Sequence, residues 1–310
     1  MNSEKMTAVI CTAYGKPEVL NIGRRNKPVI KPGEILVKII ATAVNSGDVR
    51  VRAMQASWWQ RLLMRLIIGI SKPRNPVLGT VYAGVVVEKG EQVNGFAVGD
   101  AVYGLTGFGF GTYAEYISVK ANGTVLHKPV NASFEEAAAI LFGGQTAVYF
   151  LQKAGIAARA GQKVMIYGAS GAVGVAAVQI ARYYQAEVTA VCSDTNAALM
   201  KQLGADHVVC YNTQNIMQRA GTFDLVFDAV GKMSAAQGKK LLRAGGVFKS
   251  VAGGDYAKES RQQLEFLRTL FEGGHLHAVI DKTYPLNEVV QAHHYVDGGH
   301  KKGNVVLKVG

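Results

Sequence analysis

The chain has 310 residues and a mass of 33.1 kDa, a length that predicts about two domains. Apolar residues make up 49% and charged residues 18%, which excludes an intrinsically disordered chain. The three cysteines are far apart and form no CxxC pair, and no apolar run has the length of a signal peptide or a membrane span, so we expect a soluble cytoplasmic protein.

Positive charge is concentrated in one part of the chain. The formal net charge is +12, and residues 24–74 hold eleven basic side chains against two acidic ones. Such a stretch can attract a phosphorylated cofactor, an anionic lipid surface or RNA, or it can be a solvated basic face. Nothing in the sequence predicts DNA as a partner.

The first part of the chain predicts a small β domain. Short β-branched runs occur at 7–10 and 35–40, separated by turns such as Lys31–Glu34. The same texture resumes at 82–87, 100–103 and 113–119, each bounded by glycine. We therefore predict a barrel-like β domain that ends at about residue 122.

The pattern changes after Ser133, which is followed three residues later by Glu136 and therefore predicts the capped start of a helix. From there helices and strands alternate. Strands are expected at 163–167, 187–192, 207–210, 224–228 and 247–251, and helices at 173–184 and 196–203. This alternation predicts βαβ units and a doubly wound parallel sheet. The tail, with a helix at 287–295 and a strand at 304–309, is too short for a domain, and we expect it to return to the β domain.

Residues 53–75 interrupt the β domain with an apolar, basic stretch that contains Trp58 and Trp59. It is too short and too charged to cross a bilayer. Three interpretations remain open from the sequence: a helix packed on the barrel, a lid over a substrate pocket, and a helix that binds a membrane surface.

A glycine-rich segment joins the strand that ends at Tyr167 to the next helix. It consists of Gly168, Ala169, Ser170, Gly171, Ala172, Val173 and Gly174. In nucleotide-binding folds such a junction lets the backbone approach a pyrophosphate, whose charge is held by N–H groups at the helix start. Because a strand precedes it, a helix follows it and further strands come later, the segment predicts a dinucleotide site.

The end of the second strand bears on which dinucleotide binds. An acidic side chain there would hold the ribose 2′-hydroxyl of NADH. This strand ends at Cys192, and Asp194 comes two residues later, whereas Ser193, Thr195 and Asn196 can donate hydrogen bonds to a 2′-phosphate. We therefore expect NADPH rather than NADH.

An ordered set of motifs resembles the medium-chain dehydrogenase/reductase superfamily, specifically its zinc-free quinone oxidoreductase (zeta-crystallin-like) branch. The resemblance covers nearly the whole chain. It rests on Val44–Asp48, Leu78–Thr80, Ala83–Val86, Val98–Gly104, Gly111–Tyr116, Gly144–Ala147, Tyr167–Gly174, Leu203–Asp206, Phe227–Gly231 and Gly303–Val306.

The resemblance implies an α/β protein with two domains. A GroES-like β-barrel catalytic domain would comprise residues 1–122 and 278–310, and a Rossmann dinucleotide-binding domain would comprise 123–277. Zinc-dependent relatives carry a cysteine near Ser46, a Gly-His-Glu where this chain has Gly79–Val81, and a four-cysteine loop. This chain has none of these ligands, so we expect no metal.

The resemblance also implies site residues. Asn45 stands where the family places a polar side chain beside the nicotinamide and the substrate carbonyl, and Asp48 is expected to brace the same loop. Thr146 resembles a threonine at the cofactor cleft, and Tyr211 a tyrosine near the adenosine 2′-phosphate. We also expect cofactor contacts from the phosphate-loop residues, Ser193, Val251 and Asn304.

The function implied is zinc-independent, NADPH-dependent reduction of a quinone or an α,β-unsaturated carbonyl, with Asn45 stabilising the oxygen that gains charge. Two other classes stay open: a dinucleotide-binding interaction protein that uses its basic surface to bind lipid or RNA, and a structural dimer in which the glycine segment is only a turn. A homodimer is expected for the enzyme too, because the edge strand at 247–251 must be paired or covered.

Overall fold

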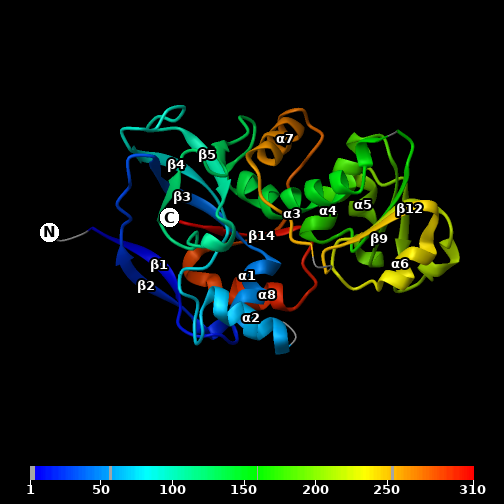
Figure 1. Ribbon diagram of the computed structural model, residues 1–310, viewed down its shortest axis with the longest axis horizontal. Coiled ribbons are helices and arrows are strands. Elements are labelled where there is room, and N and C mark those ends of the chain that lie inside the picture. The colour runs from blue at the N-terminus through cyan, green and yellow to red at the C-terminus, as the bar shows by residue number, and fades with distance from the viewer. Residues whose placement is uncertain (1–3, 56–57, 159, 253–254) are drawn as a thin grey trace.

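A computed structural model describes residues 4–55, 58–158, 160–252 and 255–310 of the chain. These residues form a seven-stranded sheet, a five-stranded sheet and a two-stranded hairpin. Figure 1 shows the two larger sheets in separate halves of the molecule, with helices between them. The C-terminus returns to the half that contains the first strands.

The seven-stranded sheet is mainly antiparallel and is ordered β13-β14-β3-β4-β5-β7, with β6 paired to β3. Its strands are β3 (Glu34–Val44), β4 (Val81–Lys89), β5 (Ala101–Leu105), β6 (Tyr116–Lys120), β7 (Val125–His127), β13 (Ile280–Pro285) and β14 (Asn304–Lys308). The hairpin of β1 (Lys5–Cys11) and β2 (Leu20–Asn26) joins this half through a bridge from Ala8 to Ala114.

Both chain ends contribute to this sheet, because β14 runs antiparallel to β3 from the first third of the chain. The sheet extends past residue 122, where the sequence placed the domain boundary. A turn in which Gly123 donates to the Lys120 carbonyl reverses the chain, and β7 then pairs with β5. Three residues are too few to give a readable alternation, which is why the sequence pattern stops short of this strand.

The five-stranded sheet is entirely parallel, in the order β10-β9-β8-β11-β12. Its strands are β8 (Lys163–Tyr167), β9 (Glu187–Cys192), β10 (His207–Cys210), β11 (Phe223–Asp228) and β12 (Leu242–Ser250). The helices that connect them are α4 (Ala172–Tyr183), α5 (Ala197–Gln202) and α6 (Ala235–Leu241). This confirms the predicted doubly wound sheet. The last strand begins earlier than predicted and ends at Ser250, so Val251 lies just beyond it.

Helix α3 (Phe134–Lys153) ties the two halves together. It begins with the predicted capping box of Ser133 and Glu136, and it packs on α4 as well as on β3, β4 and β14. Helix α7 (Arg261–Glu272) lies against α3, and the Tyr103 hydroxyl of β5 donates to the Leu264 carbonyl of α7 at 2.7 Å. One apolar core therefore continues from the antiparallel sheet into the parallel one.

Three further helices lie in the half with the antiparallel sheet: α1 (Ser46–Ala53), α2 (Trp58–Ile68) and α8 (Val289–Asp297). Among the described residues, none of the helices combines the length and the apolar character needed to cross a bilayer.

Candidate active site

The glycine-rich segment forms a tight turn between β8 and α4. Gly168 has a φ of +74°, which favours glycine, and a Cβ on Gly174 would lie 2.3 Å from the Gly168 carbonyl oxygen. Gly168, Ala169 and Ser170 make the turn, Gly171 is the N-cap of α4, and Ala172, Val173 and Gly174 begin the helix. Gly171 has no side chain to cap the helix, so the first-turn N–H groups are available for an anion. This turn fits a dinucleotide pyrophosphate.

The end of the chain packs directly on this turn, which the sequence did not predict. The Gly303 N–H donates to the Ser170 carbonyl at 2.8 Å, and Gly303 forms a parallel bridge with Gly171. Lys301 and Lys302 come directly before Gly303 in the chain, and the Lys301 ammonium donates to the Gly303 carbonyl. Burial lowers the pKa of the Lys301 ammonium to about 8, opposed by the charge of Asp281. The adjacent lysines Lys301 and Lys302 before the last strand were the sequence feature that could have indicated positive charge in this segment.

Residues predicted to read the adenosine ribose come together at the ends of β9 and β10. The Tyr211 N–H donates to the Cys192 carbonyl at 3.0 Å, and the Tyr211 ring is about half exposed. The Ser193 hydroxyl accepts a 2.9 Å hydrogen bond from the Asn196 amide. The Asp194 carboxylate accepts the N–H of Thr195, so it is turned onto its own backbone. Ser193 and Tyr211 are thus polar groups at this edge, together with Thr195, whose hydroxyl lies 2.9 Å from that of Ser193.

A buried carboxylate, Asp228, organises the loops that follow β11 and β12. One of its oxygens accepts the N–H groups of Val230 and Gly231, and the other accepts the N–H of Met233 and the hydroxyl of Ser250. The Asp228 carbonyl also accepts the Val251 N–H at 3.1 Å. The predicted contact residue Val251 is therefore fixed to the neighbouring strand at the carboxyl end of the sheet, where ligands bind in this fold.

Asn45, the predicted catalytic residue, is the N-cap of α1 and is 3% exposed. Its Oδ1 accepts the N–H groups of Gly47 and Asp48 at 2.8 and 3.1 Å. Its Nδ2 donates to the Thr80 hydroxyl oxygen at 2.9 Å. Because Thr80 Oγ1 accepts this bond, the hydroxyl hydrogen is free to point at another oxygen. The sequence did not single out Thr80 as a donor.

Asp48 braces this arrangement, as expected. One of its carboxylate oxygens accepts the Asn45 N–H at 3.0 Å and the Tyr113 hydroxyl at 3.1 Å. Complete burial raises the pKa of the Asp48 carboxyl to about 7, and the hydrogen bonds from Asn45 and Tyr113 oppose the rise. The reciprocal hydrogen bonds between Asn45 and Asp48 therefore hold the Asn45 amide in one orientation.

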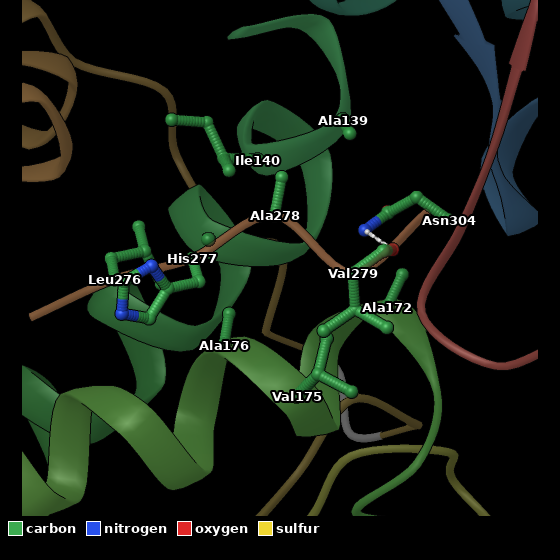
Figure 2. Close-up of a pocket in the computed structure, with 11 residues that line it drawn as sticks. Ala139, Ile140, Ala172, Val175, Ala176, Leu276, His277, Ala278, Val279 and Asn304 are labelled. Atoms are coloured by element: carbon green, nitrogen blue, oxygen red, sulfur yellow. Dashed lines mark hydrogen bonds between the residues drawn. The ribbon is translucent and has the colours of Figure 1, made fainter. Parts of the chain in front are cut away.

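The side chains of Thr146 and Asn304 form hydrogen bonds with main-chain carbonyls of the protein. The Thr146 hydroxyl donates to the Phe142 carbonyl at 2.8 Å, and the Asn304 amide donates to the Val279 carbonyl at 3.1 Å. Figure 2 shows Asn304 at a small cavity between α3 and α4, lined mostly by apolar side chains such as Ala172. At about 10 Å³ this cavity has room for a single water, so it is not the cofactor site.

A second contact between the two halves was also not predicted. Glu259, in the segment between β12 and α7, reaches the turn at Gly107–Gly109 that follows β5. A Cβ on Gly107 would lie 3.1 Å from the Glu259 carboxylate, and the Gly107 N–H donates to it. Burial raises the pKa of the Glu259 carboxyl to about 7, and this N–H opposes the rise.

The donor set does not fit zinc. Ser46, Thr80 and Val81 stand at the positions that resemble the ligand positions of zinc-dependent relatives, and they offer no thiolate, imidazole or carboxylate. Across the part of the chain that the structure describes, no three His, Cys, Asp or Glu side chains gather at one point.

Comparisons with known proteins agree with this architecture. Residues 31–130 match the family model described as the alcohol dehydrogenase GroES-like domain. Residues 203–307 match the model described as zinc-binding dehydrogenase.

Individual relatives cover almost the whole chain. It is 33% identical to 2-methylene-furan-3-one reductase from Solanum lycopersicum, over 98% of this chain and 79% of that one. It is 29% identical to the chloroplastic NADPH-dependent alkenal/one oxidoreductase from Arabidopsis thaliana, over 98% and 80%. The solved quinone oxidoreductase from Coxiella burnetii superposes with a TM-score of 0.88 at 27% identity, over 99% of this chain and 100% of that one.

Proposed function

We propose that this chain uses NADPH to reduce a quinone or an α,β-unsaturated carbonyl compound, because it belongs to the medium-chain dehydrogenase/reductase superfamily and to its zinc-free quinone oxidoreductase branch. The observation that carries the proposal is the phosphate loop with its uncapped helix start, since it provides the pyrophosphate site that such a cofactor needs. Relatives named as NADPH-dependent and as enone reductases support the cofactor and the substrate class.

The residues of the chain divide the work. NADPH, when bound, supplies the hydride. The turn at Gly168–Gly174 would hold the pyrophosphate, with Lys302 beside it, and Ser193 and Tyr211 would contact the 2′-phosphate. We assign Val251 and Thr146 to the walls of the cleft. Their contribution is shape, because the Thr146 hydroxyl is already bonded within its own helix.

The substrate oxygen gains negative charge as the hydride arrives, and it needs a hydrogen-bond donor. We assign this role to the Thr80 hydroxyl, oriented by the Asn45 amide that donates to its oxygen. Asn45 also keeps a second Nδ2 hydrogen that no described residue takes up, so it can act directly on the same oxygen. No metal ion is needed for this step.

The assembly and location of the chain are further parts of the proposal. Strand β12 lies at the edge of the parallel sheet, and among the described residues only β11 pairs with it. A homodimer that joins two such edges would remove the exposed backbone groups. We place the enzyme in the cytoplasm.

The function is tested by adding NADPH or NADH at matched concentrations in a thermal-shift assay, followed by NADPH consumption with a quinone and with a 2-alkenal. We expect NADPH to raise the melting temperature more than NADH, and consumption to require an acceptor. NADPH binding without turnover on any quinone or enone would favour the interaction-protein alternative. Absence of dinucleotide binding would overturn the assignment of the phosphate loop.

The choice of cofactor can be tested at Ser193. We expect Ser193→Asp to weaken NADPH binding about tenfold or more, because the new carboxylate would face the negatively charged 2′-phosphate. The same variant should favour NADH, because a carboxylate can accept hydrogen bonds from the ribose hydroxyls. The control is Ser193→Ala, which removes the hydroxyl without adding charge and should weaken NADPH only slightly. Dissociation constants from NAD(P)H fluorescence check both variants. Equal loss of both cofactors in Ser193→Asp would place the 2′-phosphate elsewhere.

A further inference from the structure

Among the described residues, the largest group of exposed large apolar side chains lies on and just after helix α2. Ile68 is buried in the barrel core and Met64 is half-buried against it, so these two side chains form the packed side. The outward apolar side chains, each more than half exposed, are Trp58, Leu62, Leu63, Leu66 and Ile67, with Ile70 just after the helix. An apolar face this large on one short helix points to a partner.

The exposed side chains lie on one side of the helix. Trp58, Leu62 and Leu66 are four residues apart, so they form one row, and Leu63 and Ile67 form the adjacent row. Arg61 and Arg65 follow the same spacing along the border between these rows and the packed side. The helix therefore has an apolar outer face and a basic border, which is the arrangement of helices that lie in a membrane interface.

The stretch of sequence that contains α2 is basic. Between Asp48 and Glu88 the chain has six basic residues and no acidic one, and one of the six, Arg52, is buried and paired with Asp297. Lys72 and Arg74 follow the helix, both are exposed, and the Arg74 guanidinium donates to the Leu66 carbonyl at 2.8 Å. A surface of this kind attracts anionic lipid headgroups. A second copy of the chain is a poorer partner, because it would bring one basic border against another.

The rest of the chain fixes the helix at its C-terminal end. The Arg74 N–H donates to the Ile68 carbonyl at 2.7 Å, and the Tyr14 hydroxyl donates to the Gly69 carbonyl at 2.7 Å. In Figure 1 α2 lies at the outer edge of its half of the molecule. The C-terminal end of the helix is thus held by hydrogen bonds, while its apolar side chains are exposed.

We propose that α2 docks the enzyme on anionic membrane surfaces, with its exposed apolar rows in the headgroup and acyl boundary and its basic border on the lipid phosphates. The bound enzyme would be peripheral, since the apolar rows reach only about 5–10 Å into the interface. The proposal stands without the proposed function, because vesicle binding is measured without cofactor or substrate.

Both tryptophans of the chain, Trp58 and Trp59, belong to α2, so their fluorescence reports on this helix alone. The full-length protein is mixed with phosphatidylcholine vesicles that contain about 30 mol% phosphatidylserine, and with pure phosphatidylcholine vesicles. We expect sedimentation with the anionic vesicles, a shift of tryptophan emission to shorter wavelength, and weaker binding in high salt.

Two variants and a control distinguish this proposal from non-specific adsorption of the protein to vesicles. Leu62→Ser with Leu66→Ser should lower vesicle affinity about tenfold or more, and Arg65→Glu should lower it about fivefold for anionic vesicles only. The control, Val29→Ser with Val130→Ser, changes two exposed apolar residues elsewhere and should leave binding unchanged. An unchanged melting temperature without cofactor shows that each variant is folded.

Several results would overturn the proposal. One is equal binding of the wild type and the Leu62, Leu66 variant to anionic vesicles, and another is no vesicle binding at all. Light scattering that gives a dimer in the wild type and a monomer in that variant, without vesicle binding, would make α2 a contact between copies of the chain. A tryptophan response to short single-stranded RNA instead of vesicles would assign the basic border to nucleic acid.

Discussion

Replacing Thr80 by valine is expected to lower kcat roughly 10²–10³-fold with little change in NADPH affinity, because it removes one donor to the oxygen that gains charge. Valine has nearly the shape of threonine, and Thr80 directly precedes β4, outside the phosphate loop. Steady-state kinetics with a quinone and with an enone, beside NADPH titration, measure the two effects. Thr80→Ser keeps the hydroxyl and should retain kcat within about threefold.

Asn45 needs a separate variant, because its side chain has two tasks. Asn45→Ala removes both the N-cap of α1 and the donor to Thr80, so it should cost about 1 kcal/mol of stability as well as turnover. Asn45→Ser keeps an N-cap acceptor but loses the amide hydrogens. We expect Asn45→Ser to keep the melting temperature and still to lower kcat at least tenfold.

The two sets of variants decide between a structural and a catalytic Asn45. If Asn45→Ser turns over as the wild type does, the amide is only a cap. If Thr80→Val turns over normally while Asn45→Ser does not, Asn45 acts on the substrate directly with its second hydrogen. If all of them turn over within about threefold of the wild type, neither residue stabilises the oxygen.

The parts of the fold that the sequence predicted are those written in local patterns. Strands β8, β9 and β10 have the predicted bounds, because each is a short apolar run that ends at a turn or a helix. The phosphate loop was readable for the same reason: its turn and its helix start are set by a few consecutive residues. The capping box of Ser133 and Glu136 is likewise a local signal, since it lies within four consecutive residues.

The parts that were missed depend on contacts between distant segments. The bond from Gly303 to Ser170 joins residues more than a hundred positions apart, and so does the contact of Glu259 with Gly107. The hydrogen bond from the Asn45 amide to the Thr80 hydroxyl could not be predicted either, because it requires β3 and β4 to lie side by side. The outward face of α2 shows the same limit: periodicity gives an amphipathic helix, but only packing shows which side is covered.

The second large effect is expected in the phosphate loop, where two glycine variants should both weaken NADPH binding but differ in their effect on stability. A Cβ on Gly171 would have the Gly168 carbonyl oxygen, at 3.6 Å, as its nearest neighbour, and the backbone there is extended, so Gly171→Ala should fold normally. The added methyl group nevertheless lies where the backbone must approach the pyrophosphate. We expect NADPH affinity to fall roughly 10–100-fold, measured by titration, with an unchanged melting temperature without cofactor.

Gly174→Ala should behave differently, since its Cβ would lie 2.3 Å from the Gly168 carbonyl oxygen and 2.6 Å from the backbone of Ala169. No flexible side chain can yield there, because both neighbours are main chain. We therefore expect a lower melting temperature as well as lost NADPH binding, since the third glycine sets how closely the helix packs on the strand. If Gly171→Ala bound NADPH as tightly as the wild type, the pyrophosphate would lie away from this turn. If Gly174→Ala were as stable as the wild type, α4 would have room to move from β8, and the tight packing would not be what shapes the loop.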